Sequence, residues 1–298
     1  MKIGYVGLGK MGSNMVERLL NSGYEVVVLD RDEEAVSDIV KYGAVPANSL
    51  PSLSAILPAP RVIWLMIPYQ AVDAVLGELI KSLRRGDTVI DGGNSPYRES
   101  VRHAEELAEQ GIEFLDVGVS GGPSGARSGA CIMVGGKIEA FKRLEGLFRD
   151  LSIEGGYGYM GKSGAGHFVK MVHNGIEYGM MQALAEGFTL LKTSPFGLDL
   201  INVADIFNHG SVIESKLVGW LKRAFEESGE ELRHISGSVS HSGEGLWTVE
   251  TAKEAGIPAP IIEGALKFRI NSQGSPNYTG QILSALRRQF GRHEVFKK

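Results

Sequence analysis

Four polar side chains with different chemistry occur within one short and otherwise apolar stretch. They are Lys170, His173, Asn174 and Glu177. An α-helix turns about 100° per residue, so residues three, four and seven apart share a face, and all four side chains would fall within an arc of about 100°. A solvated helix face more often repeats glutamate and lysine. The spacing therefore favours a helix that presents these groups to a cleft, although an ion pair beside a buried histidine also fits it.

The types of these residues suit acid–base catalysis. A lysine that is partly desolvated beside a positively charged nicotinamide gives up its proton more readily and can serve as a base. Glu177, on the same face, could donate a proton later in the reaction, while Asn174 and His173 could hold hydroxyl or carboxylate groups. Such a set of groups needs a redox cofactor close by.

A glycine-rich turn near the N-terminus predicts where that cofactor binds. Gly7, Gly9 and Gly12 form the spacing G-x-G-x-x-G, with Met11 inside it, between a short apolar strand and a helix. The first glycine permits a tight turn, the second lets the backbone approach a pyrophosphate, and the third lets helix and strand pack closely. The anion then lies at the positive end of the helix dipole. Glycine triplets also occur in plain turns, so the flanking strand and helix make the prediction specific.

The second predicted strand ends at Asp30, which is followed by Arg31. An acid at this position accepts hydrogen bonds from the adenosine ribose and repels a 2′-phosphate, which favours NAD. An arginine beside it can pair with that phosphate or stack on adenine, which leaves some use of NADP open. The alternative interpretation is that Asp30 and Arg31 bind no cofactor and are solvent-exposed residues at the end of a strand.

The elements that must position these groups alternate in type through the first half of the chain. Short apolar runs that predict strands begin at Lys2, Tyr24, Arg61, Asp87 and Ile112, and later ones lie in CIMVGG and YGYMG. Helical patterns lie between the earlier runs, for example in QAVDAVLGELIKSLR. This alternation predicts a parallel sheet with crossover helices.

The pattern changes at the glycine-rich segment GKSGAGH, after which helical spacing dominates. We predict an α/β Rossmann-type, doubly wound, NAD-binding domain over residues 1–162, followed by an all-α domain for substrate binding and oligomerisation over residues 163–298. In the second domain one apolar stripe with a four-residue repeat is expected to be buried. It consists of Val172, Ile176, Met180, Leu184 and Phe188.

The composition excludes several classes of function. The 298 residues carry a formal net charge of −4, with 43% hydrophobic and 22% charged residues, which predicts a globular core and does not favour binding to nucleic acid or acidic membranes. The single cysteine, Cys131, cannot form a disulfide within the chain, which fits a reducing cytoplasm. No apolar run approaches the length of a membrane span, and no signal peptide is indicated. No C-x-x-C or H-x-x-x-H spacing indicates a metal site.

Several blocks of this sequence resemble one family. The segment GAGHFVKMVHNGIEYG, from Gly164, closely resembles the active-site helix of decarboxylating 6-phosphogluconate dehydrogenases. Other blocks agree in order: GLGKMG at Gly7, DGGNS at Asp91, GVSGG at Gly118 and GEGLWT at Gly243. The resemblance covers essentially the whole chain. Its length is typical of a short branch of the family, which lacks a second block of helices.

The resemblance implies a reaction and its catalytic residues. Lys170 would take the proton of the C3 hydroxyl of 6-phosphogluconate as a hydride leaves for NAD, with NADP possible. The 3-keto acid would lose carbon dioxide, and Glu177 would protonate the enediol to give ribulose 5-phosphate, with Asn174 in the catalytic group. No metal would be needed, and the reaction would belong to the pentose phosphate pathway and to gluconate utilisation.

The resemblance also implies substrate contacts. Asn94 would lie between nicotinamide and substrate, although it could also be a simple turn residue after a strand. Ser120, Gly121 and Gly122 would hold the substrate carboxylate, although this loop could also be a flexible glycine hinge. His173, Asn174 and Tyr178 match further substrate positions. The phosphate-binding positions are matched by Arg269, Arg287 and His293, the last two reaching in from a neighbouring subunit of a homo-oligomer. A disordered basic tail is the alternative for those two.

Two residues depart from the family pattern. Ser242 and Glu244 stand where the family commonly has lysine and threonine near the phosphate. A glutamate there is unfavourable unless it turns away or pairs with an arginine, which leaves room for a different acid substrate. The alternative enzyme is a β-hydroxyacid dehydrogenase of the 3-hydroxyisobutyrate type, which does not decarboxylate. A protein that binds a dinucleotide without catalysis is a third interpretation, disfavoured because Lys170, Asn174 and Glu177 are all present.

Overall fold

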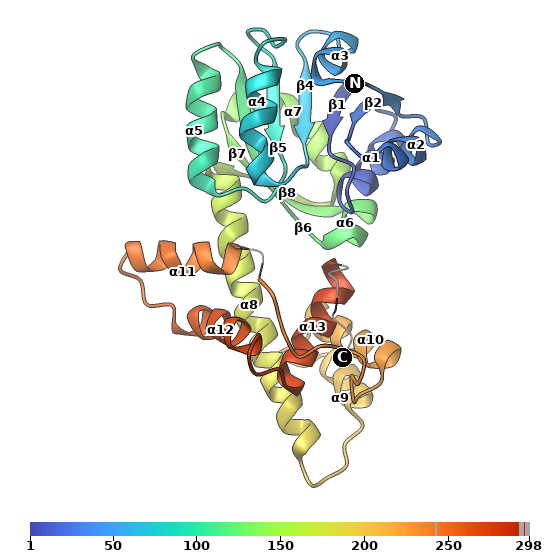
Figure 1. Ribbon diagram of the computed structural model, residues 1–298, viewed down its shortest axis with the longest axis vertical. Helices are drawn as coiled ribbons and strands as arrows, with labels where there is room; N and C mark the ends of the chain where they lie inside the picture. Colours follow the sequence, from blue (N-terminus) through green and yellow to red (C-terminus); the bar gives the residue numbers. More distant parts are fainter. Residues whose placement is uncertain (242, 292–294, 296–298) are drawn as a thin grey trace. The chain divides into compact units, whose positions relative to one another are not determined.

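The computed structural model describes residues 1–241, 243–291 and 295. The chain divides into two compact units, Met1–Lys170 (unit 1) and Met171–Lys298 (unit 2) (Figure 1). The sequence places a boundary between residues 162 and 163, in the glycine-rich segment, whereas the packing divides the chain after Lys170, inside helix α8 (Ala165–Thr193).

Unit 1 is built on one sheet (Figure 1). Its strands follow the order β3-β2-β1-β4-β5-β6-β7-β8. The strands are β1 (Lys2–Val6), β2 (Glu25–Leu29), β3 (Val45–Pro46), β4 (Val62–Leu65), β5 (Thr88–Asp91), β6 (Glu113–Ser120), β7 (Ala130–Gly136) and β8 (Ser152–Gly161). Neighbours pair in parallel except β6 and β7. This confirms the predicted doubly wound α/β class.

The antiparallel pair differs from the expected all-parallel sheet, and its cause is the length of one connection. Only residues 121–129, which include helix α6 (Gly122–Ser128), join β6 to β7. A parallel crossover needs about a dozen residues or more. The chain therefore returns alongside β6 in the opposite direction.

Helices cover both faces of the sheet because successive strand residues point to opposite sides. In β2, Val26 and Val28 join one core and Val27 joins the other. Helices α1 (Gly12–Asn21), α6 and α7 (Ile138–Leu151) supply the first core, with α2 (Glu33–Val40) at its margin. The second core takes side chains from α3 (Leu50–Ile56), α4 (Val72–Leu79) and α5 (Tyr97–Ala108), and the short 3-10 turn η1 (Tyr69–Ala71) precedes α4.

In its described residues, unit 2 is helical, which confirms the predicted all-α region. After α8 it contains α9 (Leu200–Phe207), α10 (Lys216–Ser228), α11 (Glu244–Glu254), α12 (Pro260–Ser272) and α13 (Tyr278–Gly291). Its core joins α8, α9, α10 and α13 around buried side chains such as Met181, Phe188 and Phe225. Within the part of the chain that the structure describes, no helix combines the length and the apolar character that a membrane crossing would require.

The predicted apolar stripe of α8 is wrong for two of its residues. Phe188 is buried, but Ile176 and Met180 are 53% and 46% exposed. A four-residue repeat advances by about 400° on an α-helix and so drifts by about 40° at each step. The buried face instead advances by steps of three or four residues, through Met171, Gly175, Tyr178, Met181, Ala185 and Phe188.

Candidate functional site

The glycine-rich turn lies where the sequence predicts it, between β1 and α1 in unit 1. Gly7 has φ +102°, and a Cβ there would lie 2.3 Å from the carbonyl oxygen of Met66. A Cβ at Gly12 would lie 2.0 Å from the carbonyl oxygen of Gly7, so the turn and the helix start pack backbone against backbone. A Cβ at Gly9 would meet no atom within 4 Å, which leaves the approach to its backbone open. These features fit a pyrophosphate at the start of α1.

Asp30 follows β2 and is hydrogen-bonded to the same turn. Its carboxylate accepts the N–H of Leu8 in the glycine turn and, at 2.8 Å, the N–H of Asp32. The turn is further closed by the hydroxyl of Ser13, which donates to the carbonyl of Leu8. Asp30 therefore fixes the turn and keeps lone pairs that could accept ribose hydroxyls.

Parallel pairing brings several predicted site residues to one edge of the sheet. Strands β1, β2, β4, β5 and β6 run in the same direction, so the segments after their carboxyl ends share one edge. The glycine turn follows β1, Asp30 follows β2, Asn94 follows β5, and Gly121 and Gly122 follow Ser120 at the end of β6. In an open α/β sheet this edge is where ligands bind, at the point where the strand order reverses, here between β1 and β4.

The first turns of α8 are fixed to this sheet by Asp116, a fully buried residue of β6. Its carboxylate accepts the N–H of Gly164 at 2.7 Å and that of His167 at 2.9 Å, which satisfies N–H groups that open a helix. A Cβ at Gly118 would lie 2.4 Å from the Cβ of Lys170. The buried Lys170 side chain therefore begins directly against the backbone of β6.

The other members of the polar band belong to unit 2, where they contact one another. Nδ1 of His173 lies 2.9 Å from Oδ1 of Asn174 and 4.0 Å from a carboxylate oxygen of Glu177. Asn174 donates from Nδ2 to Oε1 of Glu244 at 3.3 Å. The side chain of His173 is 40% exposed, so it differs from the buried histidine of the alternative interpretation, and the bond from Asn174 extends the band to α11.

A buried pair of arginines lies beside this band. Arg269 of α12 is 2% exposed, and its Cζ lies 3.3 Å from the centre of the Tyr178 ring. Arg287 of α13 is 8% exposed and donates from Nη1 to the hydroxyl of Ser240 at 2.9 Å. Burial lowers the pKa of Arg269 to about 10 and also lowers the pKa of Arg287. Both guanidinium groups remain charged at neutral pH.

Glu244 is the residue that departs from the family pattern, and it is 4% exposed at the first position of α11. Its carboxylate and that of Glu177 act on both arginines in the opposite sense to burial, raising their pKa values. Glu244 therefore does not turn away from the predicted phosphate region, but lies within electrostatic reach of the arginine pair.

The C-terminal residues are only partly described. Arg287 lies in unit 2 of its own chain, which differs from the expectation that it reaches in from a neighbouring subunit. The cause is that α13 continues as far as Gly291 and packs its buried face on the unit 2 core, so Arg287 is part of a helix and not of a tail. Ser242 and His293 lie outside the described residues, so their predicted roles are untested.

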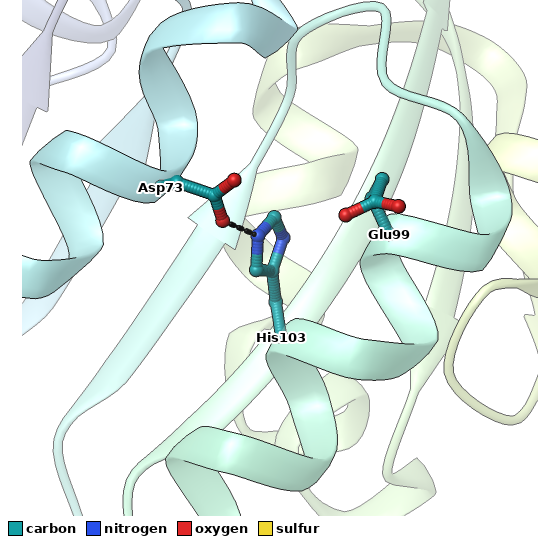
Figure 2. A group of neighbouring side chains, drawn as sticks. All are labelled: Asp73, Glu99 and His103. Carbon is teal, nitrogen blue, oxygen red and sulfur yellow. Dashed lines mark hydrogen bonds and ion pairs between the residues drawn. The ribbon is translucent and has the colours of Figure 1, made fainter.

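One group of described residues in unit 1 has the spacing of metal ligands: Asp73, Glu99 and His103 (Figure 2). Nε2 of His103 lies 2.7 Å from Oδ1 of Asp73. The guanidinium of Arg102 donates to the same oxygen at 2.6 Å and to Glu99 at 2.5 Å. The guanidinium of Arg102 thus already bridges both carboxylates, and the group is better described as a salt-bridge network. That the reaction needs no metal stays a prediction.

Sequence reasoning missed several residues that shape these sites. The sequence predicts Asp116 only as part of a strand, because its role depends on a helix that starts about fifty residues later. No motif or spacing in the sequence singles out Ser240, because its hydrogen bond with Arg287 joins a loop to a helix far along the chain. Gly118 and Gly245 belong to quoted blocks, but their close contacts with Lys170 and Tyr178 follow only from packing.

Comparisons with known proteins agree with this geometry. A family model described as the NAD binding domain of 6-phosphogluconate dehydrogenase matches residues 2–161, and one for the 6-phosphogluconate dehydrogenase C-terminal domain matches residues 166–281. The protein YqeC of Bacillus subtilis is 46% identical over 298 residues, covering all of both chains. The NAD(+)-dependent, decarboxylating 6-phosphogluconate dehydrogenase of Haloferax volcanii is 43% identical over 300 residues, covering 100% of this chain and 99% of that one.

A solved structure gives the same result for the fold. The 6-phosphogluconate dehydrogenase of Plasmodium falciparum, studied with NADP+ and with 6-phosphogluconate, matches with a TM-score of 0.82 at 30% identity. The match covers 92% of this chain and 62% of that one, so the relative is the longer protein. The chain belongs to the 6-phosphogluconate dehydrogenase family of nicotinamide-dependent oxidoreductases.

Proposed function

We propose that the chain catalyses the oxidative decarboxylation of 6-phosphogluconate to ribulose 5-phosphate and carbon dioxide, with NAD as the oxidant, as a step of the pentose phosphate pathway. The relative from Haloferax volcanii, which matches 100% of this chain, is named an NAD(+)-dependent, decarboxylating 6-phosphogluconate dehydrogenase, and this similarity supports the reaction. The observation that carries the proposal is the buried pair Arg269 and Arg287 beside Glu177 and Asn174.

Two buried guanidinium groups are costly unless anions compensate them, and the two neighbouring carboxylates supply that compensation before a ligand binds. Arg269 is held flat on the ring of Tyr178, and Arg287 is held by Ser240, so both are oriented before any ligand binds. Guanidinium groups bind phosphate through paired, charge-assisted hydrogen bonds. A small unphosphorylated hydroxyacid has only its carboxylate, which the proposed site binds at the loop after β6, and so brings no second anionic group for this pair, which disfavours the 3-hydroxyisobutyrate type of reaction.

The glycine turn, the start of α1 and Asp30 would hold the cofactor. Bound NAD would supply the acceptor for the hydride that leaves C3 of the substrate. Asp30 supports a preference for NAD because a carboxylate repels the 2′-phosphate of NADP. The adjacent Arg31 leaves some use of NADP open.

Lys170 would accept the proton of the C3 hydroxyl during oxidation. The ammonium group so formed would then donate a hydrogen bond to the C3 carbonyl oxygen and stabilise the negative charge that develops there as carbon dioxide leaves. Lys170 would return its proton to that oxygen to complete the enediol. Glu177 would then donate a proton to C1 of the enediol as the hydroxyl on the neighbouring carbon gives its proton back to Lys170, which leaves the ketone of the product. Asn94, Ser120 and the backbone of Gly121 and Gly122 would orient the substrate, together with His173 and Asn174.

We also infer that the chain works as a homo-oligomer. Large apolar side chains are exposed on several helices and loops of unit 2, and association would remove them from water. They are Ile176, Met180, Leu190, Phe196, Ile206, Val212, Ile213, Ile257, Ile261 and Ile270. Whether the tail around His293 reaches a neighbouring site is part of the same proposal, and sedimentation velocity combined with a truncation after Gly291 tests both.

A turnover assay with 6-phosphogluconate tests the proposed reaction, run with NAD and with NADP while reduced cofactor and carbon dioxide are both followed. Equal release of the two products, faster with NAD, is the expected result. Lys170→Met should abolish both products, and Glu177→Gln should slow the release of ribulose 5-phosphate. Oxidation of an unphosphorylated hydroxyacid without carbon dioxide release would instead establish the alternative enzyme.

A further inference from the structure

The anion-binding region of unit 2 already contains as many negative as positive charges among its described residues. Arg269 and Arg287 contribute two positive charges, and Glu177 and Glu244 contribute two negative ones. Glu177 has an expected catalytic role, whereas nothing in the proposed reaction uses Glu244. A buried carboxylate beside a phosphate-binding pair requires a separate explanation.

The position of Glu244 is fixed by packing on both sides. Its carbonyl accepts the hydroxyl of Thr248 at 2.8 Å, and its carboxylate accepts Nδ2 of Asn174. A Cβ on the next residue, Gly245, would lie 2.4 Å from the ring of Tyr178. The same ring carries Arg269 at 3.3 Å. The start of α11 is thus pressed against the ring that orients the arginine, and Glu244 cannot move away without disturbing it.

We propose that Glu244 is a specificity-determining residue: its buried carboxylate is the counter-ion of the Arg269–Arg287 pair, and it opposes the binding of a bare phosphate. A second anion entering this region has to overcome repulsion from Glu244, which a low-dielectric interior strengthens. Inorganic phosphate, with no other contacts, binds weakly as a result. A phosphorylated sugar acid offsets the same repulsion with its carboxylate and hydroxyl contacts, so the site selects the whole substrate over its phosphate group. This rests on the proposed function of the same site.

Several charged or titratable groups belong to the same cluster as this carboxylate. Arg269 of α12 and Arg287 of α13 each interact electrostatically with Glu244, and also with Glu177 and Tyr178 of α8, while His173 lies 4.0 Å from Glu177. The test therefore keeps pH constant, well above the range in which carboxylates titrate, and changes only Glu244. Glu244→Gln removes the charge but keeps an oxygen that can accept the hydrogen bond from Asn174.

The experiment is a calorimetric titration of the full-length protein with inorganic phosphate, without cofactor or substrate. Glu244→Gln should lower the Kd for phosphate roughly tenfold, because one repulsive charge in a buried cluster is removed. Wild-type binding too weak to measure, with measurable binding in Glu244→Gln, would support the proposal equally. Arg269→Met in the Glu244→Gln background should abolish the binding, which places the ion at the arginine pair.

Two control variants separate charge from shape. Glu263→Gln removes the same charge from the first turn of α12, where Glu263 pairs with Lys253 and Lys267 on the surface, and should leave the Kd unchanged. Glu244→Asp keeps the charge and should bind phosphate as weakly as the wild type. The proposal is overturned if Glu244→Gln binds phosphate no more tightly than the wild type, or if Glu244→Asp gains as much as Glu244→Gln. Because no turnover is measured, failure of the proposed reaction would be seen separately, in the 6-phosphogluconate assay.

Discussion

The cofactor side of unit 1 and the anion side of unit 2 are built from different parts of the polypeptide. In unit 1 the predicted ligand meets mainly backbone, at Gly7, Gly9 and the start of α1, with Asp30 holding the turn. In unit 2 the groups are buried side chains from four helices, among them Arg269 and Arg287. Substitutions that add atoms should therefore weaken binding most at the backbone site of unit 1. Substitutions that remove side-chain atoms should weaken it most at the side-chain site of unit 2.

Removal of one side chain in unit 2 should give the largest effect. Arg269→Ala deletes a buried cation and its stacking on Tyr178, and leaves Glu177 and Glu244 facing a single arginine. We expect kcat/KM for 6-phosphogluconate to fall about 10³-fold, equivalent to about 4 kcal/mol. The Kd for NAD, measured by fluorescence titration, should stay unchanged. An equal loss of NAD affinity would contradict the separation of the two sites.

An added methyl group in unit 1 should give the next largest effect. Gly7→Ala places a Cβ against the carbonyl of Met66 at a backbone φ of +102°. We expect the Kd for NAD to rise about 100-fold, because the turn must distort to relieve the contact. Gly23→Ala is the matched control, since Gly23 also has positive φ but faces open space. A similar loss of NAD affinity in the control would show that general destabilisation, and not the turn, is responsible.

Gly118→Ala tests a position where backbone packing sets the place of a catalytic side chain. The new Cβ would lie 2.4 Å from the Cβ of Lys170 and displace it. A shift of about 1 Å at a proposed base should lower kcat roughly 30-fold while the Kd for NAD stays the same. Gly77→Ala, in α4 with open space around it, should leave kcat unchanged. Normal turnover in Gly118→Ala would mean that Lys170 is not held by this contact.

The exposed salt-bridge network of unit 1 should matter least, in contrast to the buried charges of unit 2. Hydrogen bonds from Arg102 and then His103 lower the pKa of Asp73. A carboxyl whose pKa is lower in the folded state adds stability above its unfolded pKa and loses it as the pH falls through the folded value. Because Asp73 is largely exposed, Asp73→Asn should cost only about 0.5 kcal/mol of unfolding free energy at pH 7.

That small cost should disappear in acid. Urea unfolding at neutral pH and again well below pH 3.8, beneath both the ordinary pKa of the group and its lowered pKa in the folded state, measures the difference between Asp73→Asn and the wild type. A difference that grows as the pH falls would have the wrong sign for this network. A cost of several kcal/mol at pH 7 would mean that the network is not the solvated one described.

The cofactor side of unit 1 could be predicted from the sequence in more detail than the anion side of unit 2, because its residues lie close together in the chain. The glycine turn, its strand and Asp30 lie within about thirty residues, so their spacing alone predicts the turn seen after β1. The strand order and the antiparallel β7 depend on connection lengths that apolar runs do not reveal. The two-residue β3 is too short to produce a pattern.

In unit 2 the contacts join residues far apart in the chain, 91 positions for Arg269 and Tyr178 and 70 for Asn174 and Glu244. The stacking of Arg269 on Tyr178 and the bond from Asn174 to Glu244 have no local spacing to predict them. The resemblance to a family named most of these residues individually, but not how they meet. The sequence marks Glu244 only as a departure from the family pattern, and its burial within electrostatic reach of the arginine pair follows from the three-dimensional structure.

The continuity of α8 has a consequence for which changes in length the chain can tolerate. Lys170 ends unit 1 and Met171 begins unit 2, with no loop between them. An extra residue in a surface loop costs little chain entropy. One extra residue between Lys170 and Glu177 would instead rotate the second side chain by about 100° around the helix axis and shift it by about 1.5 Å. Insertions and deletions during evolution should therefore collect in the loops of this protein and be absent from these two turns of helix.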